Sequence, residues 1–237
     1  MKNIRLDKYL ADMGVGTRTE VKNLIKKGRV CVNETVIKDP GYKVNDEDNI
    51  KCDGANVSYK VYEYYMLNKP SGYITATEDR REKTVMDLIV SNRHDLFPVG
   101  RLDKDTEGLL LITNDGEMAH NLLSPKKHVA KTYYVELEND IELHYEEAFE
   151  KGIILKDGTL TKPGKLEKID NKSVYLTIYE GKFHQVKRMF EAIDNKVLYL
   201  KRMTMGTLKL DDRLELGGYR ELTTEEIENL RRHTNGN

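Results

Sequence analysis

The sequence predicts an α+β protein of two domains, a small N-terminal module followed by a larger domain of many strands and few helices. In the first sixty positions, apolar residues recur first with helical spacing and then in short β-branched runs. From Val61 onward, apolar and aromatic runs of strand length predominate. A polar segment with a glycine turn over 53–62 predicts the linker. We therefore expect one domain over 1–58 and a second over 59–237.

Two helices and a hairpin are expected in the first domain. Apolar residues spaced three and four apart over 6–13 predict a short helix that ends at a glycine. Thr17 and Glu20 have the spacing of a capping box, and they begin a second helix that should run to about Lys27. Two short strands should follow over 30–37.

One face of the second helix is basic. At about 100° per residue its cations project within a narrow sector, and apolar side chains occupy the adjoining sector. Such a face is often only solvated, but clustered cations with few acids nearby are also suited to a phosphate backbone. We expect it to bind an RNA stem or bulged junction through Arg18, Lys22, Lys26, Lys27 and Arg29.

The second domain shows several strand patterns and one distinct amphipathic helix. Strands are expected over 62–67, 109–113, 133–137 and 174–179, the last from its two-residue alternation of side chains. A helix should begin at His184, with basic and hydrogen-bonding side chains on one side and apolar side chains on the other. The polar side is either ordinary surface charge or part of a site.

Composition limits the class of protein. The chain has 237 residues, 38% hydrophobic content and a net charge of −1, so any RNA contact must come from local basic patches. Cys31 and Cys52 are too few and too far apart for a zinc site or a disulfide framework. The charged N-terminus and the lack of a long apolar run argue against a signal peptide and a membrane span, so we expect a cytoplasmic protein.

The stretch 97–113 is the most informative part of the chain. It sets Arg101, Leu102 and Asp103 in a loop between a glycine and an apolar strand, and the run 114–116 behind that strand reads as a turn. A carboxylate on such a loop can be held at the floor of a cleft, but an aspartate there can also simply cap a turn. These residues by themselves leave both interpretations open.

Five segments, in the same order along the chain, resemble the motifs of the RsuA-type pseudouridine synthases. They are 68–72, the Gly-Arg-Leu-Asp run within 97–113, the Lys-Thr-Tyr run 131–133, 180–190, and a closing pattern over 197–202 and 217–222. The first sixty residues resemble the S4 RNA-binding module. This resemblance implies a catalytic domain built on a mixed, mostly antiparallel sheet with flanking helices.

The resemblance also implies the reaction, which is isomerisation of a uridine to pseudouridine in ribosomal RNA. The segments 160–167 and 184–190 look most like members that modify small-subunit (16S) ribosomal RNA. Nothing is oxidised or lost in this reaction, so no metal, nucleotide or redox cofactor is expected, and the sequence has no Walker loop or dinucleotide fingerprint. The expected partner is ribosomal RNA or an assembling small subunit, with no membrane and a monomeric enzyme.

Residue roles follow from the matched motifs. Asp103 would act on the sugar of the target, either by attack on C1′ or by removal of a sugar proton, and Lys187 would keep it ionised. Tyr133 would stack on the displaced uracil and help remove the C5 proton, although it could also be an ordinary strand aromatic. The expected substrate pocket comprises Arg101, Leu102, Leu200, Lys69 and Pro70. Further expected RNA contacts are His184, Gln185, Arg188 and Arg202.

Three alternatives stay open at this point. The large-subunit (23S) branch of the same family shares these catalytic motifs. A non-catalytic S4-type RNA-binding or ribosome-assembly factor could keep the fold without turnover. A glycosidase-like hydrolase could use Asp103 with a second carboxylate such as Asp105 or Glu107, and it would release uracil.

Overall fold

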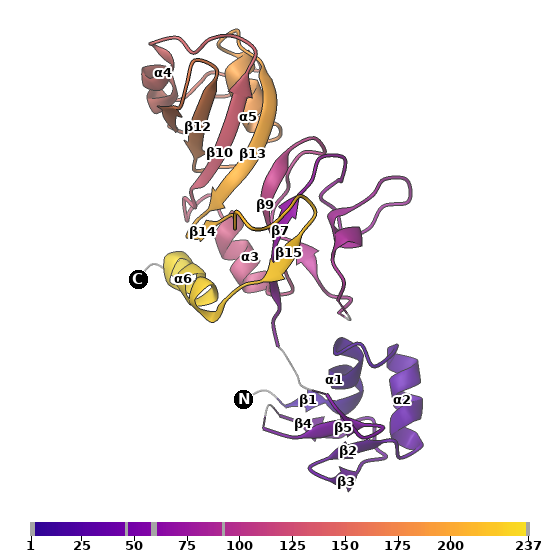
Figure 1. The fold of residues 1–237 in the computed structure, drawn as a ribbon. Coiled ribbons are helices and arrows are strands. Elements are labelled where there is room, and N and C mark those ends of the chain that lie inside the picture. Colours follow the sequence, from indigo (N-terminus) through magenta and orange to yellow (C-terminus); the bar gives the residue numbers. More distant parts are fainter. Residues whose placement is uncertain (1–2, 46, 58–60, 92, 236–237) are drawn as a thin grey trace. The chain divides into compact units, whose positions relative to one another are not determined.

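The computed structural model describes residues 3–45, 47–57, 61–91 and 93–235 (Figure 1). It divides into two compact units, one comprising Met1–Glu63 with Val90–Leu96 and the other comprising Tyr64–Ile89 with Phe97–Asn237. The boundary expected between residues 58 and 59 lies outside the described residues. The segment Val90–Leu96, expected in the second domain, groups with the first unit, where the Ser91 hydroxyl donates to the Glu63 carboxylate.

The first unit packs two helices against small sheets. Its elements are β1 (Ile4–Arg5), α1 (Leu6–Asp12), α2 (Arg18–Lys26), β2 (Val30–Val32), β3 (Thr35–Val36), β4 (Lys43–Val44), β5 (Ile50–Cys52) and β6 (Ala55–Asn56). One sheet has the order β3-β2-β5-β6, and β1 pairs with β4. The predicted helices and hairpin are confirmed, and both hydrogen bonds of the Thr17–Glu20 capping box are present. The turn at Asp53 and Gly54, expected to lead out of the module, instead joins β5 to β6 within it.

The second unit contains the remaining elements. These are β7 (Tyr64–Lys69), a 3₁₀ helix (Val85–Leu88), β8 (Phe97–Pro98), β9 (Glu107–Thr113), α3 (Gly116–Leu123), β10 (Lys131–Leu137), α4 (Tyr145–Lys151), β11 (Lys165–Lys168), β12 (Ser173–Ile178), α5 (Gln185–Glu191), β13 (Val197–Met205), β14 (Leu208–Lys209), β15 (Tyr219–Glu221) and α6 (Thr224–Asn235). The described residues of this unit form one mixed sheet with the main order β11-β12-β10-β13-β9-β7-β15. The expected mixed, mostly antiparallel sheet is confirmed, because β9 and β13 pair in parallel while the other described pairs are antiparallel.

The parallel junction of β9 and β13 is short and lies at the middle of the sheet. Lys201 pairs with Glu107 and Arg202 pairs with Gly108, after which β9 continues beside β7 and β13 continues beside β10. Figure 1 shows the two halves of the sheet meeting at this junction. The loop that carries Asp103 leads directly into β9, so the junction sets its position.

Helices cover the two halves of this sheet separately. Side chains of α3 and α6, including Met118, Leu122 and Leu230, pack into one apolar core with β7 and β9. Asp115 accepts a hydrogen bond from the Met118 amide and caps α3, so the expected turn at 114–116 is instead the start of a helix. This correction has a simple reason, since Asn-Asp-Gly suits a helix N-terminus as well as a hairpin.

The helix expected at His184 is present as α5. Its apolar side, with Val186, Met189 and Phe190, is buried, and the Phe190 ring lies 5.0 Å from that of Phe149 on α4. The opposite side therefore faces outward from the core, as predicted. Among the described residues, no helix is long and apolar enough to cross a membrane.

Candidate active site

A tight loop between β8 and β9 carries Asp103. The Thr106 amide donates to the Asp103 carbonyl (3.1 Å), and the Thr75 hydroxyl donates to the Leu102 carbonyl (2.7 Å). Beneath the loop, the fully buried ammonium of Lys69 donates to the carbonyls of Thr106 (2.8 Å), Pro70 (3.0 Å) and Lys104 (3.2 Å). The loop is thus fixed from both sides, which is what a group that must meet a reacting atom requires.

Lys69 and Pro70 were expected to line the substrate pocket, and the structure places the Lys69 side chain beneath the loop instead. Neither contributes to the cavity beside Asp103. Lys69 is the last residue of β7, and its side chain points inward. Its ammonium therefore binds carbonyl oxygens of the loop and not the substrate. Burial lowers the pKa of Lys69 to about 8, although three nearby carboxylates act to raise it.

The depressed pKa of Lys69 has a consequence for stability. An unfolded lysine titrates near pH 10.5. Between about pH 8 and 10.5, this group therefore binds more protons in the unfolded chain than in the folded protein. Its contribution to the unfolding free energy rises with pH in this range. We expect the unfolding free energy of the wild type, relative to a Lys69→Met variant, to increase by up to about 3 kcal/mol across this window. Urea titrations of both proteins at pH 7.5 and 10 measure it, and a difference that stays constant would contradict it.

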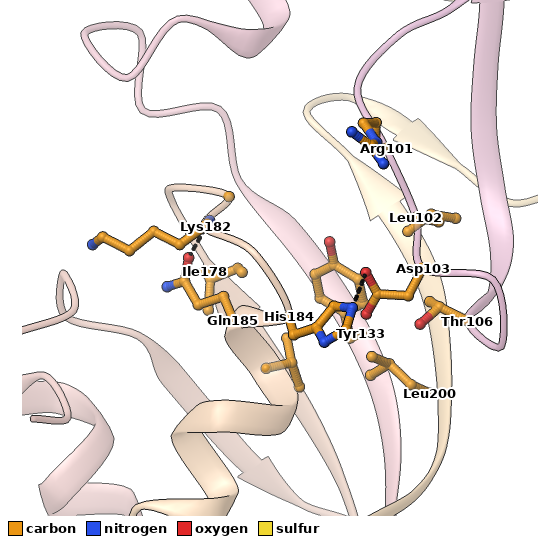
Figure 2. A pocket seen from close by; sticks show the side chains of 12 residues that line it. Arg101, Leu102, Asp103, Thr106, Tyr133, Ile178, Lys182, His184, Gln185 and Leu200 are labelled. Atoms are coloured by element: carbon orange, nitrogen blue, oxygen red, sulfur yellow. Dashed lines mark hydrogen bonds and ion pairs between the residues drawn. The ribbon is translucent and has the colours of Figure 1, made fainter. Parts of the chain in front are cut away.

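Asp103 opens into a cavity of about 660 Å³. Its walls come from the loop at 100–104, from Tyr133 on β10, from the segment 179–184 before α5 and from Arg202 on β13. Figure 2 shows the Asp103 carboxylate with the Tyr133 ring and the His184 imidazole on the same side of it in this view, and with Leu200 nearby. The size of the cavity lies within the range of small-molecule pockets in proteins.

Two cationic or ionisable groups face the Asp103 carboxylate. The Lys187 ammonium lies 3.6 Å from Oδ2, and His184 Nε2 lies 3.5 Å from Oδ1. Lys187 therefore meets Asp103 as predicted, but its shorter contact is with the Asp105 carboxylate, at 2.6 Å. Burial acts to raise the pKa of Asp105, and the hydrogen bond and charge of Lys187 outweigh it, so that this pKa lies below its ordinary value.

His184 has an unusual backbone. It stands at the N-terminal boundary of α5 with a φ of 47°, in the left-handed region, and its ring stacks on the exposed Phe183 ring at 3.8 Å. A non-glycine residue in this region costs energy and is often found at functional sites. The conformation brings the imidazole to Asp103.

The other expected pocket residues divide into walls and rim. Leu102, Tyr133 and Leu200 are buried and line the smaller recess directly at Asp103. Arg101 is exposed, and Figure 2 shows it apart from the Asp103 carboxylate. Arg101 lines both the recess and the larger cavity, so its exposed side chain can contact an approaching strand at their rim.

Several side chains expected to contact RNA have partners within the protein. Gln185 is buried and bonds to the Lys182 amide and the Glu180 carboxylate, and Arg202 is buried with its Nε donating to the Leu109 carbonyl. Arg188 is ion-paired with Asp157. The tertiary structure supplies these carbonyl and carboxylate partners, which helical spacing does not reveal. Arg202 also lines the larger cavity, and its Nη2 has no hydrogen-bond partner in the described part of the chain.

The basic face of α2 is present, but two of its members are not free. Arg29 forms a two-pronged ion pair with Asp53, and Arg18 lies 3.8 Å from the buried Asp7 carboxylate. Lys22, Lys26 and Lys27 are exposed. The RNA-binding prediction for this helix therefore depends mainly on these lysines.

Other members of the site were not predicted from the sequence. Thr106 and Lys182 line the recess with Asp103, and Lys131 lies in the wall of the larger cavity. All three fall within or next to segments already matched as motifs, so proximity to a motif residue was the available signal. No cluster of three histidine, cysteine or acidic side chains suited to a metal occurs in the described ranges.

Comparison with known proteins identifies this arrangement. Residues 63–192, which include Asp103, Tyr133 and Lys187, match the model of the RNA pseudouridylate synthase family. The chain belongs to the RNA pseudouridylate synthase family. Residues 4–50 of this pseudouridylate synthase match the S4 domain.

Relatives of this pseudouridylate synthase match it over nearly their whole length. An RNA pseudouridine synthase of Bacillus subtilis, YtzG, is 49% identical, with 94% of this chain and 97% of that protein covered. Ribosomal small subunit pseudouridine synthase A of Vibrio cholerae is 43% identical, with 96% and 99% covered. A crystal structure of a pseudouridylate synthase is 40% identical and covers 96% of this chain and 99% of its own, with a TM-score of 0.69.

Proposed function

We propose that this pseudouridine synthase modifies a uridine of small-subunit ribosomal RNA, with Asp103 as the group that acts on the ribose. The observation that carries the proposal is the Asp103 carboxylate at the opening of a cavity, 3.6 Å from the Lys187 ammonium and beside the Tyr133 ring. The printed name of the Vibrio cholerae relative supports the small subunit as the target. Since the substrate would be ribosomal RNA, we propose that the enzyme acts in the cytoplasm as a monomer.

The reaction sets the demands on the site. The bond from uracil N1 to ribose C1′ breaks, the base turns, and C5 bonds to the same C1′ while the C5 proton is lost and N1 gains one. Asp103 either attacks C1′ or removes a sugar proton to begin this sequence. Lys187 places a positive charge 3.6 Å from the Asp103 carboxylate, and its 2.6 Å ion pair with Asp105 holds it in position.

Tyr133 and Leu200 have complementary roles in this proposal. The Tyr133 ring lines the recess beside Asp103. In this proposal it stacks on the detached uracil and limits its escape, and its phenol helps to remove the C5 proton. Leu200 closes the apolar side of the recess. Extrusion of the nucleotide from its stack costs a few kcal/mol, and the exposed Arg101 at the rim offsets part of this cost.

A hydrolase mechanism has less support from the site. Glycoside hydrolysis needs a second carboxyl group that holds a proton near the scissile bond. Asp105 is ion-paired with Lys187 and has a lowered pKa, while Glu107 accepts from the Tyr199 hydroxyl at 2.7 Å. Both line a neighbouring cavity, and neither lines the recess at Asp103.

Mapping pseudouridines in ribosomal RNA from cells with and without this protein tests the proposal. We expect one uridine of the small-subunit RNA to lose its modification and to regain it when purified enzyme acts on the unmodified RNA. If cells without the protein instead lack a pseudouridine in the large-subunit RNA, the enzyme belongs to that branch and the substrate proposed here is contradicted. Unchanged maps with intact RNA binding would indicate an adaptor, and released uracil would indicate a hydrolase.

The basic face of α2 should supply part of the RNA affinity. Lys22 and Lys26 are exposed on one side of the helix. For each phosphate that a lysine neutralises, the plot of log binding constant against log salt concentration becomes steeper by about 0.7–0.9, and we call this steepness the salt slope. The double variant Lys22→Met, Lys26→Met is expected to weaken binding and lower that slope by about 1.5. Filter binding of a small-subunit RNA transcript at several salt concentrations measures it. The exposed Lys209→Met is the matched control, and an unchanged slope in the double variant would rule out this face.

A further inference from the structure

Two buried cations lie together in the wall of the large cavity. Lys131 on β10 and Arg202 on β13 lie on the same face of adjacent strands as Tyr133, which is the cross-strand partner of Arg202. Their residues are only 8% and 2% exposed. Burial and, to a smaller extent, the charge of Arg202 together lower the pKa of Lys131 to about 8.

Neither cation has an acidic partner among the described residues. The Lys131 ammonium donates to the Val129 carbonyl at 3.2 Å, and Arg202 Nη2 is buried without any hydrogen-bond partner. Burying an unpaired charge is costly, so proteins normally supply a counter-charge. Here the fold instead places two like charges side by side.

The acids that line the cavity are already engaged. Asp103 faces Lys187 and His184, and Glu180 is ion-paired with Lys182 at 2.6 Å and accepts from the Gln185 side chain. Neither is available to neutralise Lys131 or Arg202. The cavity wall therefore carries a positive charge that an anion could balance.

A structural role explains only part of this arrangement. Arg202 Nε satisfies the Leu109 carbonyl at 2.7 Å, close to the point where β9 and β13 diverge. That contact accounts for one guanidinium nitrogen, but it leaves Nη2 and the whole Lys131 ammonium unexplained. A leucine or methionine would fill the position of Lys131 without the desolvation cost.

We infer that Lys131 and Arg202 form a seat for a phosphate of the RNA backbone directly flanking the target uridine. This inference rests on the proposed function of the same cavity. An ammonium and a free guanidinium arm are suited to a phosphate, and charge-assisted hydrogen bonds are about twice as strong as neutral ones. Such a seat would anchor the everted nucleotide by its backbone while its sugar faces Asp103.

Binding of mononucleotides to the purified full-length protein tests the seat without any need for turnover. Uridine, uridine 5′-monophosphate, uridine 3′-monophosphate and inorganic phosphate are titrated separately by calorimetry. We expect one of the two monophosphates to bind about tenfold or more tightly than uridine. The preferred isomer would identify which side of the target the seated phosphate lies on.

The same titrations with a Lys131 variant are the decisive part of the experiment. Lys131→Met should reduce the monophosphate preference to within about threefold of uridine and raise Tm, because it removes an uncompensated buried charge. Arg202→Met should also reduce the preference, although it can weaken the β9–β13 junction. Lys209→Met, an exposed cation on β14, should change neither quantity.

Several outcomes would overturn the seat. Equal binding of uridine and both monophosphates to the wild type would do so, and so would a preference that survives Lys131→Met. Inorganic phosphate could also bind as tightly as the monophosphates and lose this affinity in Lys131→Met. The ligand would then be a free phosphate ion, and the proposed contact with the RNA backbone would be contradicted. A failure of the proposed function would appear separately, as unchanged pseudouridine maps.

Discussion

Asp103→Asn is expected to abolish pseudouridine formation, with a loss of about 10³-fold or more in the single-turnover rate. The amide has the size of the carboxylate but is neutral and far less nucleophilic, so it can neither attack C1′ nor take a sugar proton. RNA affinity should change little, because Asp103 lies in the cavity and the α2 lysines are in a different unit. Tritium release from C5-labelled uridine in a small-subunit RNA transcript measures the rate.

The matched control for this substitution is Asp212→Asn, which changes the same functional group on an exposed segment between β14 and β15. This variant should turn over like the wild type. Thermal unfolding of both variants separates lost chemistry from lost structure. Wild-type turnover in Asp103→Asn would remove Asp103 from the mechanism and with it the role assigned to Lys187.

Gly108→Ala is expected to destabilise the protein by about 3 kcal/mol or more. Gly108 has a φ of 97° and pairs with Arg202 where β9 and β13 meet. A Cβ atom at this position would overlap the Arg202 carbonyl oxygen and lie 2.8 Å from its amide nitrogen. Both obstacles are backbone atoms of the central sheet, so relief requires the two strands to separate.

Gly72→Ala isolates the contribution of the backbone angle. Gly72 has a similar φ of 91°, but nothing lies within 4 Å of a Cβ atom built there. Its loss of stability should be about 1 kcal/mol, from conformational strain alone. Urea unfolding of both variants measures the difference, and equal losses would show that the close approach at Gly108 contributes nothing.

Local patterns in the chain predicted much of the architecture. The capping box at Thr17 and Glu20, the alternation over 174–179 and the amphipathic stretch after His184 each correspond to an observed element. These features are encoded over a few neighbouring residues, so they can be read without knowledge of the fold. Asp115 shows the limit, because the same short run suits either a turn or a helix cap.

The site was predicted less evenly than the fold. Asp103, Tyr133 and Leu200, expected from motif resemblance, line one recess, and Lys187 reaches Asp103 from a helix more than eighty residues away along the chain. Lys69, Gln185 and Arg202 were assigned to substrate or RNA contacts, yet their side chains bond inward to carbonyls and carboxylates. A cation in a motif looks the same in sequence whether it faces a ligand or the core.

The sequence by itself determined the family and the order of its two parts, and it predicted Asp103 as the carboxylate that acts on the ribose. Only the tertiary structure decided which cations are free to act. Lys187 contacts both Asp103 and Asp105, and the Lys69 ammonium binds carbonyl oxygens of the loop that carries them. Among the described residues, Lys131 and Arg202 have no acidic partner. The reason is physical, because the energy of a charge depends on burial and on partners brought together from distant strands and helices.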